Sequence, residues 1–144
     1  MTSIRSLPPL ASRDGVSPSK VWCPRGSWRL LEEFLLERFP HVSPEVLLER
    51  LARGDILDQD GVRQQPGSPY QAERWLWYFR MVENEAVVPF EMPVLYKDER
   101  LIAVDIPHFL ATTPGGRYLS ETALTRLRRD FGEDDISPIH RLDR

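Results

Sequence analysis

Apolar residues recur at helical spacing between residues 27 and 40, and the residues between them are mostly charged. Ser27 stands where a helix N-cap is expected, and Pro40 stands where such a helix must end. The apolar positions would share one face of this helix, at Trp28, Leu31, Phe34 and Leu35. The pattern therefore predicts a short amphipathic helix that starts after Ser27.

A second predicted helix is marked at both ends. Ser43 is placed as its N-cap, Pro44 follows at the first helical position, and Gly54 comes just past its last turn. Its apolar face carries Leu47, Leu48 and Leu51. The pair Ile56-Leu57, followed by the turn formers Asp60-Gly61, then predicts a short hairpin. The first part of the chain should therefore contain two helices and a hairpin.

Residues 74–82 alternate in a way that is typical of a half-buried strand. One face of this strand would carry Trp75, Trp77, Phe79 and Met81. Aromatic rings beside arginines can stack on unpaired bases, but such strands are rich in aromatic residues for packing reasons alone. Packing is the favoured interpretation, and residues 83–93, which contain two prolines, are expected to form an extended linker.

Two further strands are predicted at residues 94–96 and 101–104, joined by a polar turn. Ser120 is then placed as the N-cap of a third helix, which should end at Gly132. Its apolar face would carry Leu124, Leu127 and Phe131. Helices and short strands in this order predict an α+β fold.

Composition restricts the classes of function. The 144 residues are 41% hydrophobic and 28% charged with a formal net charge of -3, which argues against a protein that coats nucleic acid generally. Cys23 is the only cysteine, so a disulfide within the chain and a cysteine zinc site are excluded, and a cytoplasmic location with a partly exposed free thiol is expected. Residues 1–22 contain several prolines and serines but no spanning segment, and are expected to form a disordered leader without membrane contact.

The run His140-Arg141-Leu142-Asp143 is the most specific chemical signal in the chain. It closely resembles the active-site motif of the RluA-type family of RNA pseudouridine synthases. The preceding order also resembles that family, with Pro107 and Pro114-Gly115-Gly116 in the places of its proline loop and its glycine-containing segment. A lysine commonly precedes the proline in the family, and Ile106 stands there instead, so no role is assigned to a lysine.

The resemblance implies an enzyme that isomerises uridine to pseudouridine in ribosomal or transfer RNA without a cofactor. Asp143 would be the nucleophile, Arg141 would assist the flipping of the uridine and contact RNA, and His140 would flank the site. His140 and Asp143 could also be metal ligands, but a third ligand is not evident, and no metal is expected.

Residues 23–70 resemble the S4-type RNA-binding module that many members of the family carry at the N-terminus. Arg50 and Arg53 could form a small RNA-facing patch there, although the module is acidic on balance and a solvated helix face explains them as well. Arg117 and Arg126 could hold an RNA backbone beside the third helix, with a mixed solvent-exposed face as the equal alternative.

The domain organisation predicted from these signals has four parts. They are a leader at 1–22, the S4-like module at 23–70, an aromatic strand and linker at 71–93, and an incomplete catalytic domain at 94–144. Family members carry an active-site tyrosine and a further basic residue downstream of the motif, so this chain alone is expected to be an inactive, monomeric fragment. The competing hypothesis is a non-catalytic RNA-binding or vestigial protein.

Overall fold

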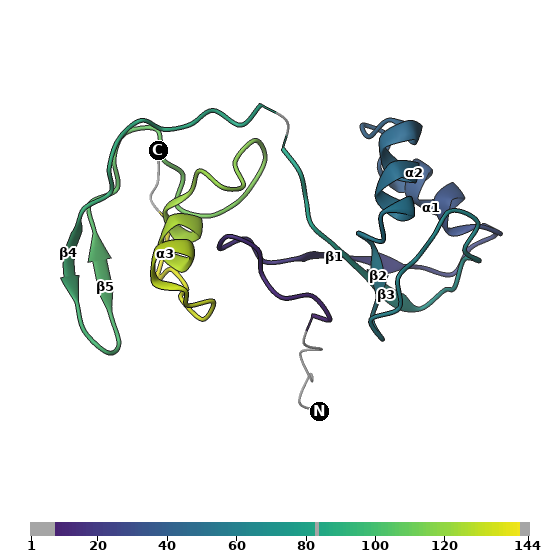
Figure 1. Cartoon of the computed structure of the whole chain (residues 1–144), viewed down its shortest axis with the longest axis horizontal. Coiled ribbons are helices and arrows are strands. Elements are labelled where there is room, and N and C mark those ends of the chain that lie inside the picture. The colour runs from purple at the N-terminus through teal and green to yellow at the C-terminus, as the bar shows by residue number, and fades with distance from the viewer. Residues whose placement is uncertain (1–7, 83, 142–144) are drawn as a thin grey trace. The chain divides into compact units, whose positions relative to one another are not determined.

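The structure is a computed structural model that describes residues 8–82 and 84–141. These residues form two compact units, each with its own small antiparallel sheet (Figure 1). The first unit comprises residues 8–11 and 18–79, and the second comprises the other described residues. Three helices and two sheets over the described residues confirm the α+β class.

The sheet of the first unit has the strand order β1-β3-β2. Strand β1 (Ser19–Cys23) pairs along its whole length with β3 (Arg74–Tyr78), and the short β2 (Leu57–Asp58) pairs with the other edge of β3. Both pairings are antiparallel, and Trp22 lies opposite Trp75 across the first of them. The aromatic strand predicted from the sequence is therefore the central strand of this sheet.

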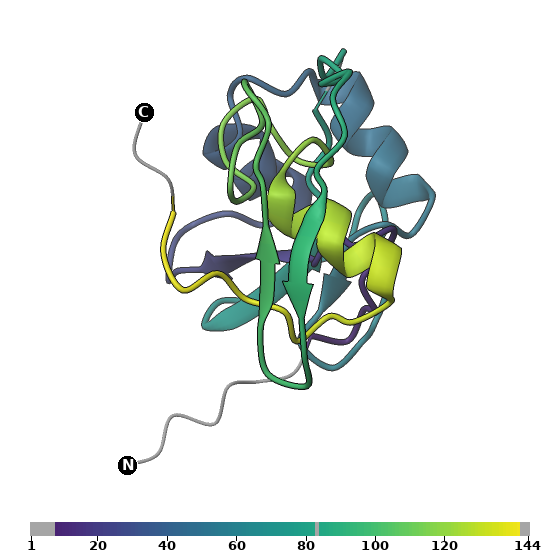
Figure 2. The same ribbon diagram turned by 90° about the vertical axis from the view of Figure 1, so that its left-hand side faces the viewer.

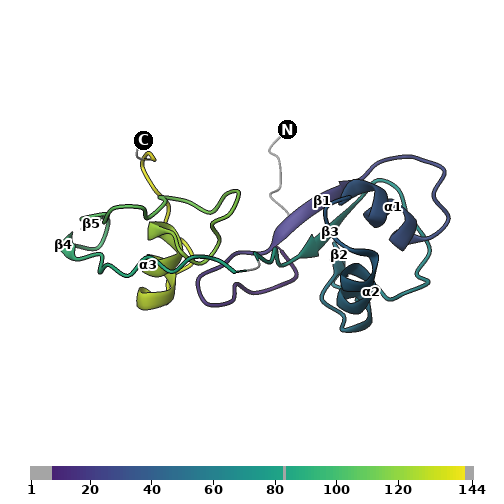
Figure 3. The ribbon, with the colours of Figure 1, turned by 90° about the horizontal axis from the view of Figure 1, so that it is seen from above.

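Helices α1 (Leu31–Arg38) and α2 (Pro44–Ala52) pack against one face of this sheet (Figure 3). Helix α2 has the predicted N-cap, since the Ser43 hydroxyl oxygen accepts a hydrogen bond from the Val46 N–H at 3.4 Å. The buried residues of the core come from both helices, β1, β3 and the start of the predicted hairpin: Val21, Cys23, Leu31, Phe34, Leu35, Leu47, Leu51, Ile56 and Leu76.

The expectation of a disordered leader at 1–22 is wrong for its described part. Residues 19–22 belong to β1, which pairs with β3. Val21 and Cys23 point into the core, while Lys20 and Trp22 point outward. Cys23 is 1% exposed rather than partly exposed, and burial raises the pKa of its thiol to about 11. Residues 1–7 lie outside the described residues.

Helix α1 begins later than predicted. Its N-cap is Leu30, and Ser27 does not cap it. The Glu33 carboxylate accepts hydrogen bonds from the N–H groups of Arg29 at 2.9 Å and Leu30 at 3.2 Å. The Leu31 N–H donates to the Ser68 carbonyl at 2.9 Å, so a contact distant in sequence holds the segment before the helix extended.

The second unit contains a hairpin of β4 (Val94–Lys97) and β5 (Ile102–Val104) next to α3 (Ala123–Phe131), as Figure 2 shows. The Lys97 amine nitrogen lies 4.0 Å from the centre of the Phe131 ring, which joins the hairpin to the helix. The hairpin follows the prediction to within one residue at each strand.

The start of α3 differs from the prediction, because Thr122 and not Ser120 is its N-cap. The Thr122 hydroxyl oxygen accepts from the Thr125 N–H at 3.0 Å, whereas the Ser120 N–H is bound elsewhere, by the Glu85 carboxylate at 3.0 Å. Gly132 ends the helix in the left-handed conformation, as predicted, with φ of 63°.

Residues 12–17 belong to the second unit although they precede β1 in the sequence. Arg13 and Val16 pair through two backbone hydrogen bonds around a tight turn in which Gly15 has φ of 80°. A Cβ atom at Gly15 would lie 2.4 Å from the Thr125 carbonyl oxygen of α3. The turn is therefore packed directly on the helix.

None of the helices within residues 8–82 and 84–141 is both long enough and apolar enough to cross a membrane.

Candidate functional site

A cavity of about 860 Å³ in the second unit brings Arg141 next to the loop that follows β5. The loop contributes residues 105–115 and Tyr118 to the wall, and Arg141 contributes the other side. We call this space the loop cavity. It contains Pro107 and the Pro114-Gly115 pair, so the structure places the proline loop and the motif arginine at one site.

The far end of this loop is a tight turn. Gly115 and Tyr118 exchange two backbone hydrogen bonds, of 2.9 and 3.0 Å, around Gly116 and Arg117. Gly116 has φ of 56°, a conformation that glycine adopts without strain. Arg117 is exposed at the end of the turn, which leaves its side chain accessible to a ligand.

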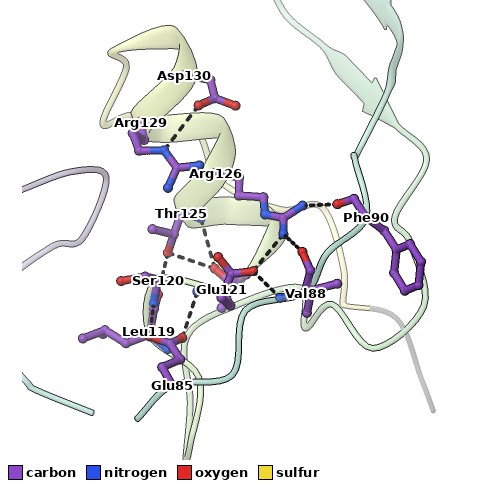
Figure 4. Close-up of polar contacts among 11 residues, drawn as sticks. Glu85, Val88, Phe90, Leu119, Ser120, Glu121, Thr125, Arg126, Arg129 and Asp130 are labelled. Carbon is purple, nitrogen blue, oxygen red and sulfur yellow. Dashed lines mark hydrogen bonds and ion pairs between the residues drawn. The ribbon is translucent and has the colours of Figure 1, made fainter. Parts of the chain in front are cut away.

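The loop is fixed by the segment that the sequence predicts as a linker (Figure 4). The Glu85 carboxylate accepts hydrogen bonds from the N–H groups of Leu119 at 2.6 Å, Ser120 at 3.0 Å and Glu121 at 2.8 Å. The Arg80 guanidinium donates to the Tyr118 carbonyl at 2.8 Å. Both contacts act on backbone groups at the end of the turn and directly after it, so Arg80 and Glu85 together hold this end of the loop in place.

Arg126, one of the predicted RNA contacts, binds groups of the chain itself, and its RNA contact stays a prediction. Its guanidinium donates to the carbonyls of Val88 and Phe90, each at 2.8 Å, and pairs with the Glu121 carboxylate at 2.8 Å (Figure 4). Its side chain is only 12% exposed. Arg126 therefore joins residues 88–90, which the sequence predicts as part of a linker, to α3.

Glu121 shares this network. Burial raises the pKa of its carboxyl, but the hydrogen bond from the Val88 N–H and the Arg126 guanidinium outweigh that effect and make the net shift downward. The carboxylate is therefore charged when it pairs with Arg126.

The segment that leads to the motif is held by α3. The Arg128 guanidinium donates to the Ile136 carbonyl through two nitrogen atoms, at 3.0 and 2.9 Å. His140 is exposed and lines a neighbouring groove of about 1090 Å³ between the β4–β5 hairpin and α3. Asp143, the predicted nucleophile, lies outside the described residues, two positions after Arg141.

Two curated proteins are similar to the chain. A protein of Synechocystis sp. named Uncharacterized RNA pseudouridine synthase is 34% identical over 110 residues, which are 76% of this chain and 38% of the relative. Both relatives carry the name RNA pseudouridine synthase, and the chain is similar to proteins of that family. RNA pseudouridine synthase 5 of Arabidopsis thaliana is 29% identical over 146 residues, covering 94% of this chain and 38% of that protein. No protein-family model matches the chain.

The chain spans about two fifths of the length of the curated relatives that it matches. The match to the Arabidopsis synthase extends over nearly the whole chain and therefore includes both units.

The remaining predicted RNA contacts, Arg50 and Arg53, lie in the first unit. Arg53 forms ion pairs with Asp55 at 3.1 Å and with Glu49 at 3.9 Å, which reduces the positive potential that it offers to a phosphate. The Nε atom of Arg50 is buried and has no hydrogen-bond acceptor among the described residues. An RNA contact at Arg50 and Arg53 stays a prediction.

Sequence reasoning assigned no structural role to Arg80, Glu85 or Arg128. All three act on backbone groups, and such contacts leave no pattern of paired residue types in a sequence. No group of three potential metal-binding side chains occurs within the part of the chain that the structure describes.

Proposed function

We propose that a protein containing this chain is an RluA-type synthase that isomerises uridine to pseudouridine in ribosomal or transfer RNA. The observation that supports it best is the place of Arg141, which lines the loop cavity two residues before Asp143. We infer that the Asp143 carboxylate acts at this cavity, because only one residue separates it from Arg141 in the sequence. The names of both curated relatives support the same reaction class.

The proposed reaction uses the side chains of this chain and no cofactor. The target uridine leaves the helical stack and enters the loop cavity, where Arg141 contacts the RNA backbone. The Asp143 carboxylate acts as the nucleophile and bonds to the sugar or to the base ring. The N1–C1′ bond breaks, the base turns, C5 bonds to C1′, and the bond to the carboxylate breaks again. The proton leaves C5 while N1 gains one.

The described units would contribute different parts of this function. The loop cavity and the motif belong to the second unit, which we propose is the beginning of the catalytic domain. The first unit, with α1 and α2 followed by β2, we propose to be S4-like and to contact RNA through Arg50 and Arg53. His140 and Arg117 would contact RNA beside the loop cavity. A cytoplasmic location and a monomeric state also stay predictions.

The test is tritium release from RNA that carries 5-tritiated uridine, because pseudouridine formation frees the hydrogen at C5 and binding alone does not. The protein should be extended to the length of the curated relatives, and we expect the 144-residue chain alone to release nothing. Asp143→Asn should lower the rate on the order of 10⁴-fold or more, as the loss of a nucleophile does.

Asp134→Asn is the matched control, because Asp134 is an exposed aspartate of the same unit outside the loop cavity. It should leave the rate unchanged. Full turnover by Asp143→Asn would refute the proposed nucleophile. Binding of RNA without tritium release by the extended protein would instead favour a non-catalytic RNA-binding protein.

A further inference from the structure

Phe109 has an unfavourable backbone conformation for its type of side chain. Its φ of 68° lies in the left-handed region, which a bulky residue adopts only when its surroundings impose it. The other described non-glycine residues with positive φ are polar: Asp14, Glu73 and Asn84. Aspartate and asparagine are enriched in this region, whereas phenylalanine is not.

Packing within the chain does not compensate for this conformation. The Phe109 side chain is 76% exposed, while its neighbour Leu110 is 7% exposed and belongs to the core of the second unit. The nearest ring is His108, with 6.1 Å between the ring centres. The backbone therefore turns the phenyl ring outward, where folding alone gains nothing from it.

The exposed ring lies at the wall of the loop cavity, which also contains Arg141. An aromatic ring beside a guanidinium group suits unpaired RNA, because the ring can stack on a base and the arginine can bind a phosphate. Arg117, exposed at the end of the same loop, adds positive charge for the backbone of the RNA. This chemistry fits a nucleic acid better than an apolar protein segment.

We propose that Phe109 stacks on an unpaired base of the RNA strand that enters the loop cavity. The proposal rests on the function proposed above and adds a specificity-determining residue to it. The strained backbone keeps the ring in the orientation that stacking requires before the RNA arrives. A single-stranded or unpaired stretch around the target uridine is then preferred over a continuous duplex.

The experiment measures binding of the 144-residue chain to a labelled single-stranded oligouridine by fluorescence anisotropy. Phe109→Trp retains a stacking ring and should bind at least as tightly as the wild type. Phe109→Leu retains apolar bulk without a ring and should weaken binding about fivefold to 100-fold, the range for loss of one stacked base. Phe109→Gly should weaken binding as much.

Thermal unfolding of the same variants separates binding from folding. Phe109→Gly should unfold at the wild-type temperature or above it, because glycine accepts a positive φ without strain. A lower unfolding temperature for this variant would show that Phe109 serves folding and would overturn the proposal. Wild-type affinity in Phe109→Leu would overturn it as well.

Arg141→Ala distinguishes failure of this proposal from failure of the proposed function. If Arg141→Ala weakens binding and Phe109→Leu does not, the loop cavity binds RNA and only the stacking contact is wrong. If the wild-type chain binds no oligouridine, the RNA-binding role of this cavity and the stacking contact both fail. A concentration-dependent mass increase that Phe109→Leu abolishes would assign the ring to contacts between copies and overturn the proposal.

Discussion

Within the part of the chain that the structure describes, the apolar core of the first unit contains nine buried residues. The apolar core of the second unit contains three. The second unit instead relies on charged side chains that bind backbone groups. Glu85 accepts three N–H groups, and Arg126 donates to two carbonyls and pairs with Glu121. Polar contacts of this kind set the positions of loops but contribute less stability than a large core.

The difference matches the proposed roles of the units. The second unit leaves large apolar residues exposed, among them Leu95, Leu101, Phe109 and Ile139. It also carries the loop cavity, so its polar contacts hold a binding loop over a small core. The first unit also exposes Trp22, Leu48 and Val62, but its helices and sheet enclose a larger apolar core. The comparison predicts that the two units respond to different changes.

Leu51→Ala should give the largest effect and confine it to the first unit. Leu51 is fully buried between the helices and the sheet, so its truncation should lower the free energy of unfolding of that unit by about 3 to 5 kcal/mol. Amide hydrogen exchange should show lost protection in α1, α2 and β3 and unchanged protection in α3. Leu48→Ala, at a 37% exposed position of the same helix, is the control and should cost less than about 1 kcal/mol.

Arg126→Met should destabilise the second unit rather than the first. The substitution keeps an apolar side chain but leaves the Glu121 carboxylate and the Val88 and Phe90 carbonyls without their donor. We expect a loss of about 2 to 3 kcal/mol in the second unit, read from exchange of the α3 amides. Arg129→Met removes a 44% exposed arginine of the same helix and should change stability by less than about 0.5 kcal/mol. Equal effects of the two substitutions would contradict the role of Arg126.

Sequence patterns sufficed where one element carries its own signals. Helix α2 has its Ser43 cap, and Gly132 ends α3 where predicted. The apolar positions of α1 at Phe34 and Leu35 are buried as their spacing indicates. These features depend on residues a few positions apart, which is the range over which capping and periodicity act.

The sequence failed where a contact between distant residues decides the conformation. Pairing with β3 makes a strand of Ser19–Cys23, and Glu85 binds the Ser120 N–H, so that α3 starts at Ala123. For the site, the sequence named Arg141 and the proline loop as separate features, and only the structure shows that both line the loop cavity. The outward ring of Phe109 depends on a backbone conformation that residue type argues against, so only the structure could reveal it.

Gly15→Ala tests whether residues 12–17 belong to the second unit. A Cβ atom there would lie 2.4 Å from the Thr125 carbonyl oxygen, and φ of 80° adds strain of its own. Gly132→Ala is the matched control, because Gly132 also has a positive φ but nothing within 4 Å of the new Cβ position. We expect Gly15→Ala to destabilise the α3 amides by about 1 kcal/mol or more beyond the control. Equal losses would mean that the turn does not pack on α3.

Mild acid should give the smallest change and should act on the second unit first. The pKa of Glu121 is lowered in the folded chain, so its stabilising contribution is complete above the ordinary glutamate pKa of about 4.3 and is lost as pH falls through the lower folded value. Glu33 in the first unit also has a lowered pKa, through hydrogen bonds from the Arg29 and Leu30 N–H groups, but its carboxylate is exposed and its unit rests on the apolar core.

Residue-resolved exchange followed from pH 6 downward should therefore show α3 losing protection before α2, once exchange rates are corrected for the intrinsic effect of pH. The amide of Glu121→Gln cannot gain a proton in this range, so the substitution should weaken the second unit at pH 6 and remove most of its further response to acid. If α2 loses protection first, carboxylates of the first unit matter more than its core, and the contrast between an apolar and a polar mode of stabilisation would fail.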